Sequence, residues 1–404
     1  MEPLGIYVHI PFCAGKCPYC DFNSRPARAG DIARYLAALE REIELRLVEP
    51  GRLGRGDDGR GRPCSVCDTI YFGGGTPTLV PPDAAARLLN HIRQLVDLAD
   101  DAEVTIEGNP ETITCEALAA LRAAGFNRLS VGAQSFDDGV LTALGRRHDA
   151  ARARDAIADA RAAGWDNIAL DLIFGAPGQT ARQWIATLEQ AVALRPQHVS
   201  AYCLTIEPGT EFHRRLVAGE MTAAGEEMEL EMYAAACAAL RAAGYERYEI
   251  SNFALPGRRC RHNQKYWQGG DYVGLGAGAH SRRAGMRWAN ESEPRRYADL
   301  LARGKAPVGY AERLSARRRL EEELMLGLRT EQGACLTQLG ARHGRDVAGE
   351  YRSRIQYLVR AGLATVPRSE TGMAAGGLAT DGSRVVLTER GIAVANEVAL
   401  RLMS

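Results

Sequence analysis

The sequence predicts an α/β fold in which a parallel sheet is wrapped by helices and closed, or partly closed, as a barrel, with a smaller α+β domain after it. Short apolar or β-branched runs alternate six times with longer segments of helical spacing, and this alternation stops after Gly309. Repeated strand–helix units favour parallel strands, because each helix carries the chain back to the same edge of the sheet. Barrels of this kind bind ligands at the C-terminal ends of their strands.

The expected elements of the barrel can be given in chain order. The six runs with strand character are 5–10, 69–72, 103–107, 128–131, 167–173 and 198–204. The segments with helical spacing between them include 32–48, 84–95, 115–124, 151–163 and 181–194. Residues 51–62 interrupt this order with glycine, arginine and aspartate and almost no apolar residue, so we expect an exposed insertion there.

The chain after residue 309 has a different pattern. Helical spacing is strong over 314–328 and returns briefly at 336–339 and 351–361, and residues 364–366 and 385–387 have the character of two strands around a glycine-rich turn. This pattern is typical of a small winged-helix-like domain. Arginines there barely outnumber acidic residues, which favours packing or partner docking over DNA binding. We therefore expect a barrel core over 1–240, an extension over 241–310 and a C-terminal domain over 311–404.

Composition excludes several classes of partner. The chain has 404 residues, 46% of them hydrophobic, and its 50 Lys and Arg balance its 50 Asp and Glu, so no basic excess points to nucleic acid. No apolar run approaches the roughly 20 residues of a membrane span, and no signal peptide is evident. The ten cysteines are scattered through a large chain, as in a reducing compartment. We expect a cytoplasmic protein.

The loop after the first expected strand carries three cysteines, Cys13, Cys17 and Cys20. Their four- and three-residue spacing suits three irons of a 4Fe-4S cluster and leaves the fourth iron open. The alternatives are a zinc knuckle or three unrelated thiols. Zinc would need a fourth ligand nearby, and Asp21, Phe22 and Asn23 offer only one carboxylate. The spacing therefore favours an iron–sulfur cluster with one reactive position.

Polar and glycine-rich segments follow several of the other expected strands. Gly73-Gly74-Gly75 would let the backbone approach a ligand closely, although tight turns use glycine as well. At later strand ends Glu107 could accept hydrogen bonds from ribose hydroxyls, Gln134 could donate and accept, and Arg146 could clamp a carboxylate. Each such residue alone is more often a surface or capping residue. Their chemistry alone therefore leaves their roles open.

A second motif, Cys260-Arg-His-Asn-Gln-Lys-Tyr-Trp267, lies in the expected extension. His262 could ligate heme iron, and Tyr266 and Trp267 could lie against a porphyrin face. The alternative is a buried His-Asn pair beside two core aromatics, which chemistry alone favours. Cys64 and Cys67 could form a dithiol or a second metal site, but two incidental thiols are the simpler interpretation.

With Tyr7, His9 and Pro11-Phe12 before it, the cysteine loop resembles the cluster motif of the radical S-adenosylmethionine (SAM) proteins. It is most similar to the branch that contains the oxygen-independent coproporphyrinogen III oxidases and the HemW-type heme chaperones, and the resemblance covers most of the chain. The resemblance implies a partial (β/α)6 TIM-like barrel of the radical SAM type with a small C-terminal winged-helix-like α+β domain. It also implies SAM, chelated at the open iron.

The resemblance assigns roles to individual positions. It implies that the three cysteines bind the cluster, and that SAM is contacted by Tyr7, Tyr19, Gly74, Gly75, Thr76, Glu107, Gln134, Arg146 and Asp171. The sequence His-Asn-x-x-Tyr-Trp matches the heme-binding motif of the chaperone branch. This match implies that His262 ligates heme iron and that Asn263, Tyr266 and Trp267 lie at the heme.

Two functions then compete. One is a heme chaperone that passes heme to an acceptor hemoprotein, which could be respiratory; the other is a coproporphyrinogen III oxidase of porphyrin biosynthesis. Three features favour the chaperone: twelve residues precede Cys13, Phe22 stands where those oxidases have a fourth cysteine, and the His262 motif belongs to the chaperone branch. Whether the chain is an enzyme that cleaves SAM, and whether it forms a homodimer, stay open.

Overall fold

The computed structural model describes residues 3–47, 66–367 and 384–403. The chain forms two compact units: the first comprises Met1–Glu246, Phe253–His262 and Asp271–Glu312, and the second Arg247–Asn252, Asn263–Gly270 and Arg313–Ser404. The expected insertion at 51–62 and the glycine-rich turn before residue 384 lie outside the described residues. The expected extension, 241–310, is divided between the two units.

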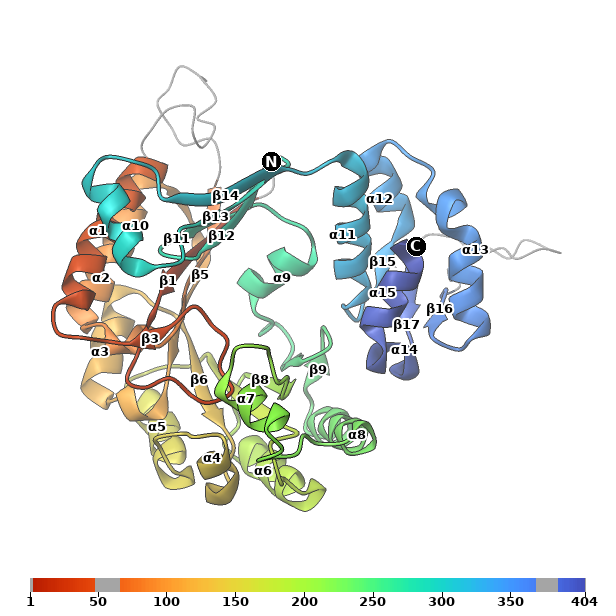
Figure 1. Ribbon diagram of the computed structural model, residues 1–404, viewed down its shortest axis with the longest axis horizontal. Helices are drawn as coiled ribbons and strands as arrows, with labels where there is room; N and C mark the ends of the chain where they lie inside the picture. The colour runs from red at the N-terminus through yellow and green to blue at the C-terminus, as the bar shows by residue number, and fades with distance from the viewer. Residues whose placement is uncertain (1–2, 48–65, 368–383, 404) are drawn as a thin grey trace. The chain divides into compact units, whose positions relative to one another are not determined.

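The centre of the first unit is a parallel sheet, shown in Figure 1. Its six successive strands are β1 (Leu4–Ile10), β4 (Val66–Gly74), β5 (Asp97–Gly108), β6 (Arg128–Gln134), β7 (Ile168–Phe174) and β8 (His198–Cys203). Neighbours in this order pair in parallel, so each connection moves the chain by one strand. All six predicted strands are confirmed, and the fold is the predicted α/β class.

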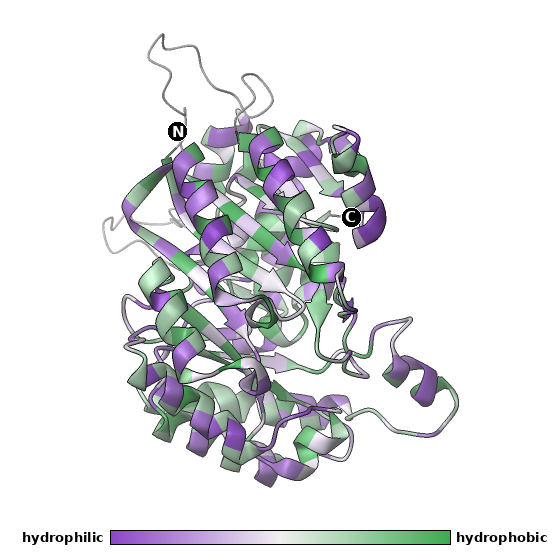
Figure 2. Cartoon of the chain, turned by 90° about the vertical axis from the view of Figure 1, so that its left-hand side faces the viewer, coloured by the Kyte–Doolittle hydropathy of each residue, from purple (hydrophilic) through white to green (hydrophobic). Residues whose placement is uncertain are grey.

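Helices return the chain between these strands. They include α1 (Asp31–Leu47), α2 (Pro82–Leu95), α3 (Cys115–Ala124), α5 (Ala150–Ala162) and α6 (Ala181–Ala193), which confirm the five predicted segments. Each buries one side against the sheet, as α2 does with Leu88, Leu89 and Ile92. Hydrophobic and hydrophilic residues accordingly alternate around these helices (Figure 2). The remaining helices of this part are α4 (Asp138–Ala143), α7 (Glu211–Val217), α8 (Glu226–Ala242) and α10 (Pro294–Ala302).

Strands from much later in the chain extend the sheet beyond β1. β11 (Tyr272–Leu275) pairs with β1 in parallel, and β12 (His280–Arg283) and β13 (Met286–Asn290) follow antiparallel. β14 (Val308–Arg313) lies next to β13, and the short strands β10 (Asn252–Ala254) and β9 (Glu246–Arg247) continue the sheet past β8. Because strands lie on both sides of it, β1 is an interior strand of the sheet. The sequence did not predict these added strands individually.

A buried carboxylate fastens α1 to this extension. Glu42 of α1 is fully buried and accepts hydrogen bonds from the Tyr297 hydroxyl, the Asn290 amide and the Gly276 N–H, each at 2.7 Å. Burial raises the pKa of Glu42, while Arg46 and these donors lower it in part. The network satisfies a group that would be costly to bury alone.

The second unit has its own core. Its helices are α11 (Ala316–Leu328), α12 (Leu336–His343), α13 (Val347–Arg360), α14 (Glu389–Ala393) and α15 (Ala395–Met403). They enclose Leu320, Leu324 and Val398, among other apolar residues. Three short antiparallel strands complete the unit in the order β15 (Ala334–Cys335), β17 (Arg384–Leu387) and β16 (Ala364–Thr365). This is the predicted winged-helix-like architecture. No helix among the described residues is long and apolar enough to cross a bilayer.

Candidate functional site

The cysteine loop runs between two short parallel strands, β2 (Phe12–Cys13) and β3 (Arg25–Pro26). Cys13 ends β2, and the N–H of Cys20 donates to the Cys17 carbonyl at 3.1 Å. All three thiols are free and half-buried. Within the described ranges no three His, Cys, Asp or Glu side chains are grouped as ligands of one metal ion. A cubane cluster takes each thiolate on a different iron, and the binding of such a cluster by these cysteines stays a prediction.

The charges around the thiols fit this use. Burial raises the pKa of Cys20, and Cys17 and Cys13 raise it further, whereas the Phe22 backbone and the Lys16 ammonium lower it. The three thiols therefore lie close enough to influence one another. The Arg146 guanidinium donates to the Cys17 sulfur at 3.4 Å. This contact places a cation beside the cysteine loop.

The glycine segment at the end of β4 lies directly against the start of the cysteine loop. The N–H of Gly75 donates to the Ile10 carbonyl, and the N–H of Thr76 to the Phe12 carbonyl, both at 2.8 Å. A Cβ at Gly75 would stand 2.5 Å from the Phe12 carbonyl oxygen. Only glycine permits this approach. The segment thus lies against the end of β1 and the residue before Cys13, and its role as a ligand-binding loop stays a prediction.

Glu107 lies at the C-terminal end of β5 and faces β4. It accepts from the Tyr71 hydroxyl at 2.7 Å and from the Gly74 N–H at 3.0 Å. Burial, with a contribution from the Asp171 charge, raises the pKa of Glu107 to about 7. Asp171 accepts from the Ser130 and Ser200 hydroxyls, at 2.9 and 2.7 Å, and burial raises its pKa as well. Both carboxylates are thus held in fixed positions inside the barrel.

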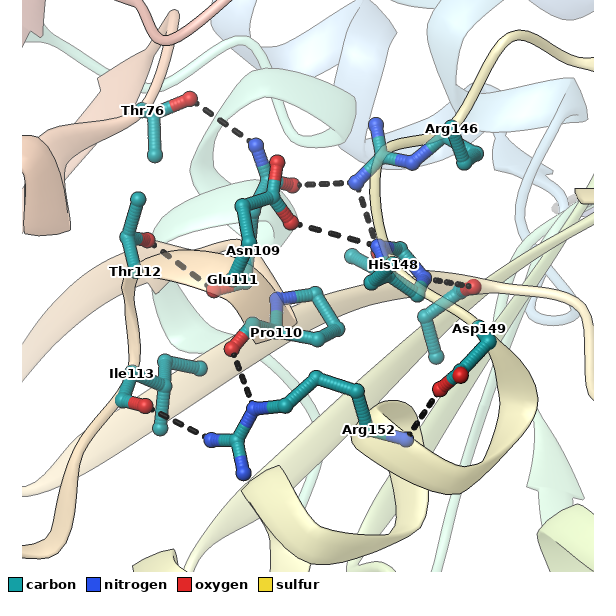
Figure 3. A network of polar contacts seen from close by, with 12 residues as sticks. Thr76, Asn109, Pro110, Glu111, Thr112, Ile113, Arg146, His148, Asp149 and Arg152 are labelled. Atoms are coloured by element: carbon teal, nitrogen blue, oxygen red, sulfur yellow. Dashed lines mark hydrogen bonds and ion pairs between the residues drawn. The ribbon is translucent and has the colours of Figure 1, made fainter.

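Hydrogen bonds link Thr76, which follows the glycine segment, to Arg146 through Asn109 (Figure 3). The Asn109 amide donates to Thr76 Oγ1 at 2.9 Å, and Arg146 donates to Asn109 Oδ1 at 2.7 Å. Arg146 also donates to Cys17, as described above. Burial alone would lower the pKa of Arg146, but Tyr19, Cys17 and Glu111 outweigh it, so the guanidinium stays charged. Of these residues the sequence predicted Thr76, Arg146, Tyr19 and Cys17, and missed the bridging Asn109.

The remaining predicted SAM residues make other contacts. Tyr7 is buried, its hydroxyl lies 3.1 Å from His9 Nδ1, and its ring stacks on Tyr71 at 6.1 Å. Tyr19 lies in the cysteine loop with its ring 6.2 Å from that of Phe212. Gln134 is the last residue of β6 and is half-buried. Within the described part of the chain, no side-chain hydrogen bond joins Gln134 to the other predicted residues.

His262 lies in α9 (Arg261–Trp267) and points into the barrel of the first unit. Its Nδ1 is 2.9 Å from Thr69 Oγ1, and its ring stacks on Tyr71 and Tyr7 at 5.2 and 6.3 Å between centroids. The backbone N–H of His262 donates to the Glu103 carboxylate at 3.1 Å. The side chain is buried, so ligation of heme would require the imidazole to leave this position.

The other residues of the predicted heme motif, Asn263, Tyr266 and Trp267, belong to the second unit. The Arg329 guanidinium lies over the Trp267 ring at 5.7 Å from its centroid. The motif is therefore split between the units within a single helix. Of the other cysteines considered, Cys67 is buried in β4 and its thiol contacts the Thr69 carbonyl, while Cys64 lies outside the described residues.

The sequence matches known families and proteins. Residues 7–191 match the family model of the radical SAM superfamily, and residues 314–394 match the HemN C-terminal domain. The whole chain is 38% identical to heme chaperone HemW of Mycobacterium tuberculosis, strain H37Rv, and covers 95% of it. It is 34% identical to heme chaperone HemW of Bacillus subtilis, strain 168, with 97% of each covered.

The fold also matches a solved structure. Coproporphyrinogen III oxidase HemN from Escherichia coli, a radical SAM enzyme, superimposes with a TM-score of 0.81 and covers 100% of this chain and 90% of its own. Its sequence identity of 23% supports the fold alone. The identities of 38% and 34% over nearly the full chain show the family as well. The chain belongs to the HemW family of the radical SAM superfamily.

Proposed function

We propose that this protein is a heme chaperone of the cytoplasm that binds heme on a radical SAM scaffold and passes it to an acceptor hemoprotein. The observation that carries the proposal is the 38% identity, over the full chain, to proteins named as heme chaperones. Two sequence features support it. The chain has the His-Asn-x-x-Tyr-Trp motif, and Phe22 stands where the related oxidases have a fourth cysteine.

Membership of the superfamily implies a 4Fe-4S cluster and SAM. In the proposal Cys13, Cys17 and Cys20 hold three irons, and Arg146 donates a hydrogen bond to the Cys17 sulfur. When bound, the cluster and SAM supply a site for one-electron chemistry, which the protein controls through what it places beside them. The SAM contacts would come from Gly74, Gly75, Thr76, Glu107, Gln134 and Asp171, with Tyr7 and Tyr19 flanking them.

His262 is the proposed heme-iron ligand. Neutral imidazole is a common axial ligand of heme. In the present conformation its Nδ1 is engaged with the Thr69 hydroxyl and its ring lies on Tyr71. Binding heme would exchange these contacts for an iron bond and for contacts from Asn263, Tyr266 and Trp267.

The first test is a heme titration of the anaerobically reconstituted protein, followed by absorbance. Wild-type protein should bind heme stoichiometrically. His262→Ala should weaken binding by at least about tenfold, which corresponds to 1.4 kcal/mol, because the iron loses its protein ligand. The matched control is His280→Ala, which removes an exposed histidine from the neighbouring strand β12 and should leave heme binding unchanged.

Two further results decide the interpretation. Cys17→Ser should lose the cluster and retain heme, so joint loss of cluster and heme in His262→Ala would indicate misfolding and reject the ligand assignment. The same preparation, given SAM, a reductant and coproporphyrinogen III, should form no protoporphyrinogen. Steady formation of that product would identify an oxidase and overturn the chaperone proposal.

A further inference from the structure

The end of β6 contains a strained turn at Gln134. The pairing of β6 with β7 shifts register between Val131 and Gln134, so β6 carries one extra residue there. Gln134 has φ of 63°, and the Ser135 N–H donates to the Ala133 carbonyl at 2.8 Å. A positive φ with this two-residue hydrogen bond is the pattern of the rare classic γ-turn. A non-glycine residue keeps such a conformation only where its surroundings enforce it.

Two side chains from the turn before α5 hold the bulged carbonyls. Arg146 Nη2 lies 3.1 Å from the Gly132 oxygen, and His148 Nε2 lies 3.1 Å from the Ala133 oxygen. The His148 side chain is fully buried, and its other ring nitrogen, Nδ1, is 3.2 Å from Glu111 Oε2. Both ring nitrogens of His148 therefore face oxygen atoms, one of the Ala133 carbonyl and one of the Glu111 carboxylate. Figure 3 shows this pair beneath Arg146.

The strained turn also fixes where the Gln134 side chain points. A Cβ placed on Gly132 would stand 2.8 Å from Asn109 Oδ1 and 3.0 Å from the Gln134 amide nitrogen. The amide therefore lies beside Asn109, in the same group of residues that bonds Arg146 and Thr76. A turn released from Ala133 would relax toward ordinary φ and move this amide.

We propose that His148, supported by Glu111, is a positioning residue for SAM: it anchors the turn that aims Gln134 at the ligand. Among the described residues, the His148 side chain bonds to Glu111 and to the Ala133 carbonyl, and not to the cysteines or the glycine segment. Its effect on SAM is therefore exerted through the Ala133 carbonyl. The inference rests on SAM binding as the family implies it and is independent of heme. A failed heme titration would leave it standing.

The test is calorimetric titration of SAM into the anaerobically reconstituted protein, with iron and sulfide content measured in parallel. His148→Leu should weaken SAM binding about tenfold, which is the lower end of the loss expected when a group that orients a ligand is removed. The cluster content should be unchanged. This loss of SAM affinity should vanish when Gln134 is already replaced by Ala. If His148 acts only by positioning the Gln134 side chain, its removal has no further effect once that side chain is gone. A purely structural role would give the same loss in both backgrounds.

Replacing His148 by Gln or by Asn distinguishes its contact with Ala133 from its contact with Glu111. His148→Gln places a donor near the position of Nε2 and should retain most of the SAM affinity, whereas His148→Asn places its donor near Nδ1 and should behave like His148→Leu. Glu111→Gln should stay within about twofold of wild type, since a neutral imidazole can still donate to Ala133 and accept from the new amide.

A buried His–Glu pair in the second unit serves as the control. His343 Nε2 lies 3.1 Å from Glu323 Oε2, and His343→Leu should leave SAM affinity unchanged. The proposal is overturned if His148→Leu binds SAM like wild type, if its loss persists undiminished with Gln134→Ala, or if wild-type protein with an intact cluster does not bind SAM.

Discussion

Glu107 is the site residue whose protonation is most open to measurement. Its pKa is raised to about 7 by burial and by Asp171, against an ordinary value of 4.5. Between those two values the folded protein holds a proton that the unfolded chain has released. This contribution to stability is complete below pH 4.5 and is lost as pH rises through 7.

Replacing Glu107 by Gln removes this dependence. The amide can accept from the Gly74 N–H and donate to the Tyr71 hydroxyl, so both contacts persist. Relative to wild type, the ligand-free variant should gain about 2–3 kcal/mol of unfolding free energy between pH 5 and pH 8. Denaturant unfolding at constant ionic strength measures this difference. The exposed Glu116→Gln on α3 is the control, and an equal trend in both variants would reject the assignment to Glu107.

Sequence reasoning reached Glu107 but not its partner Tyr71. A strand-end carboxylate can be read from the chain, whereas its partner depends on the register of β4 against β5, where one residue of slip turns each side chain to the opposite face. His148 and Asn109 were missed for a related reason. His148 contacts the bulge in β6, and Asn109 joins Thr76 to Arg146. Both contacts form only when β6 and the turn after it are folded. The pattern Arg146-x-His148 was the available signal.

At the scale of the elements, the contact between the glycine segment and the cysteine loop tolerates little change. In Gly75→Ala the new Cβ would stand 2.5 Å from the Phe12 carbonyl oxygen and 2.9 Å from that of Ile10. Both are backbone atoms, so the segment must shift. We expect a loss of about 1–3 kcal/mol in stability and a lower cluster content after reconstitution.

Gly225→Ala is the matched comparison for this substitution. Gly225 precedes α8 with φ of −79°, and nothing lies within 4 Å of a Cβ there. Iron and sulfide analysis of the two variants, with thermal unfolding, measures the effect. Equal cluster content in both would show that the close approach at Gly75 is not required.

The regular elements were predictable and the sheet extension was not. The spacing of apolar residues predicts helices α2, α3 and α6. A capping box at Thr180 and Gln183 also marks the start of α6. By contrast, β11 is four residues long and owes its place to pairing with β1. Such a strand has no local signal strong enough to predict. Residues Asp97–Ala102 of β5 are rich in aspartate, and β4 pairs with their first part despite poor strand propensity.

At the scale of the molecule, each unit has a separate hydrophobic core. Leu88 belongs to the first and Leu324 to the second, and both are almost fully buried. Calorimetry of the intact protein should therefore show two unfolding transitions. Leu88→Ala should lower one midpoint and Leu324→Ala the other, each by the equivalent of about 2–5 kcal/mol. A single transition shifted by both variants would show that the cores unfold together.

The position of β1 in the middle of the sheet has a consequence for how the protein is made. The loop that carries the cysteines follows β1, yet the Asn23 amide in that loop bonds the carbonyls of Ala277 and Ser292, at 3.0 and 2.9 Å. Arg25 pairs with Glu293 at 2.7 Å. A ribosome must therefore add more than two hundred and sixty residues after Asn23 before the last of these partners leaves its exit tunnel. Until then the scaffold around the cysteines is incomplete, so iron and sulfide are best delivered after the chain has been made beyond Glu293.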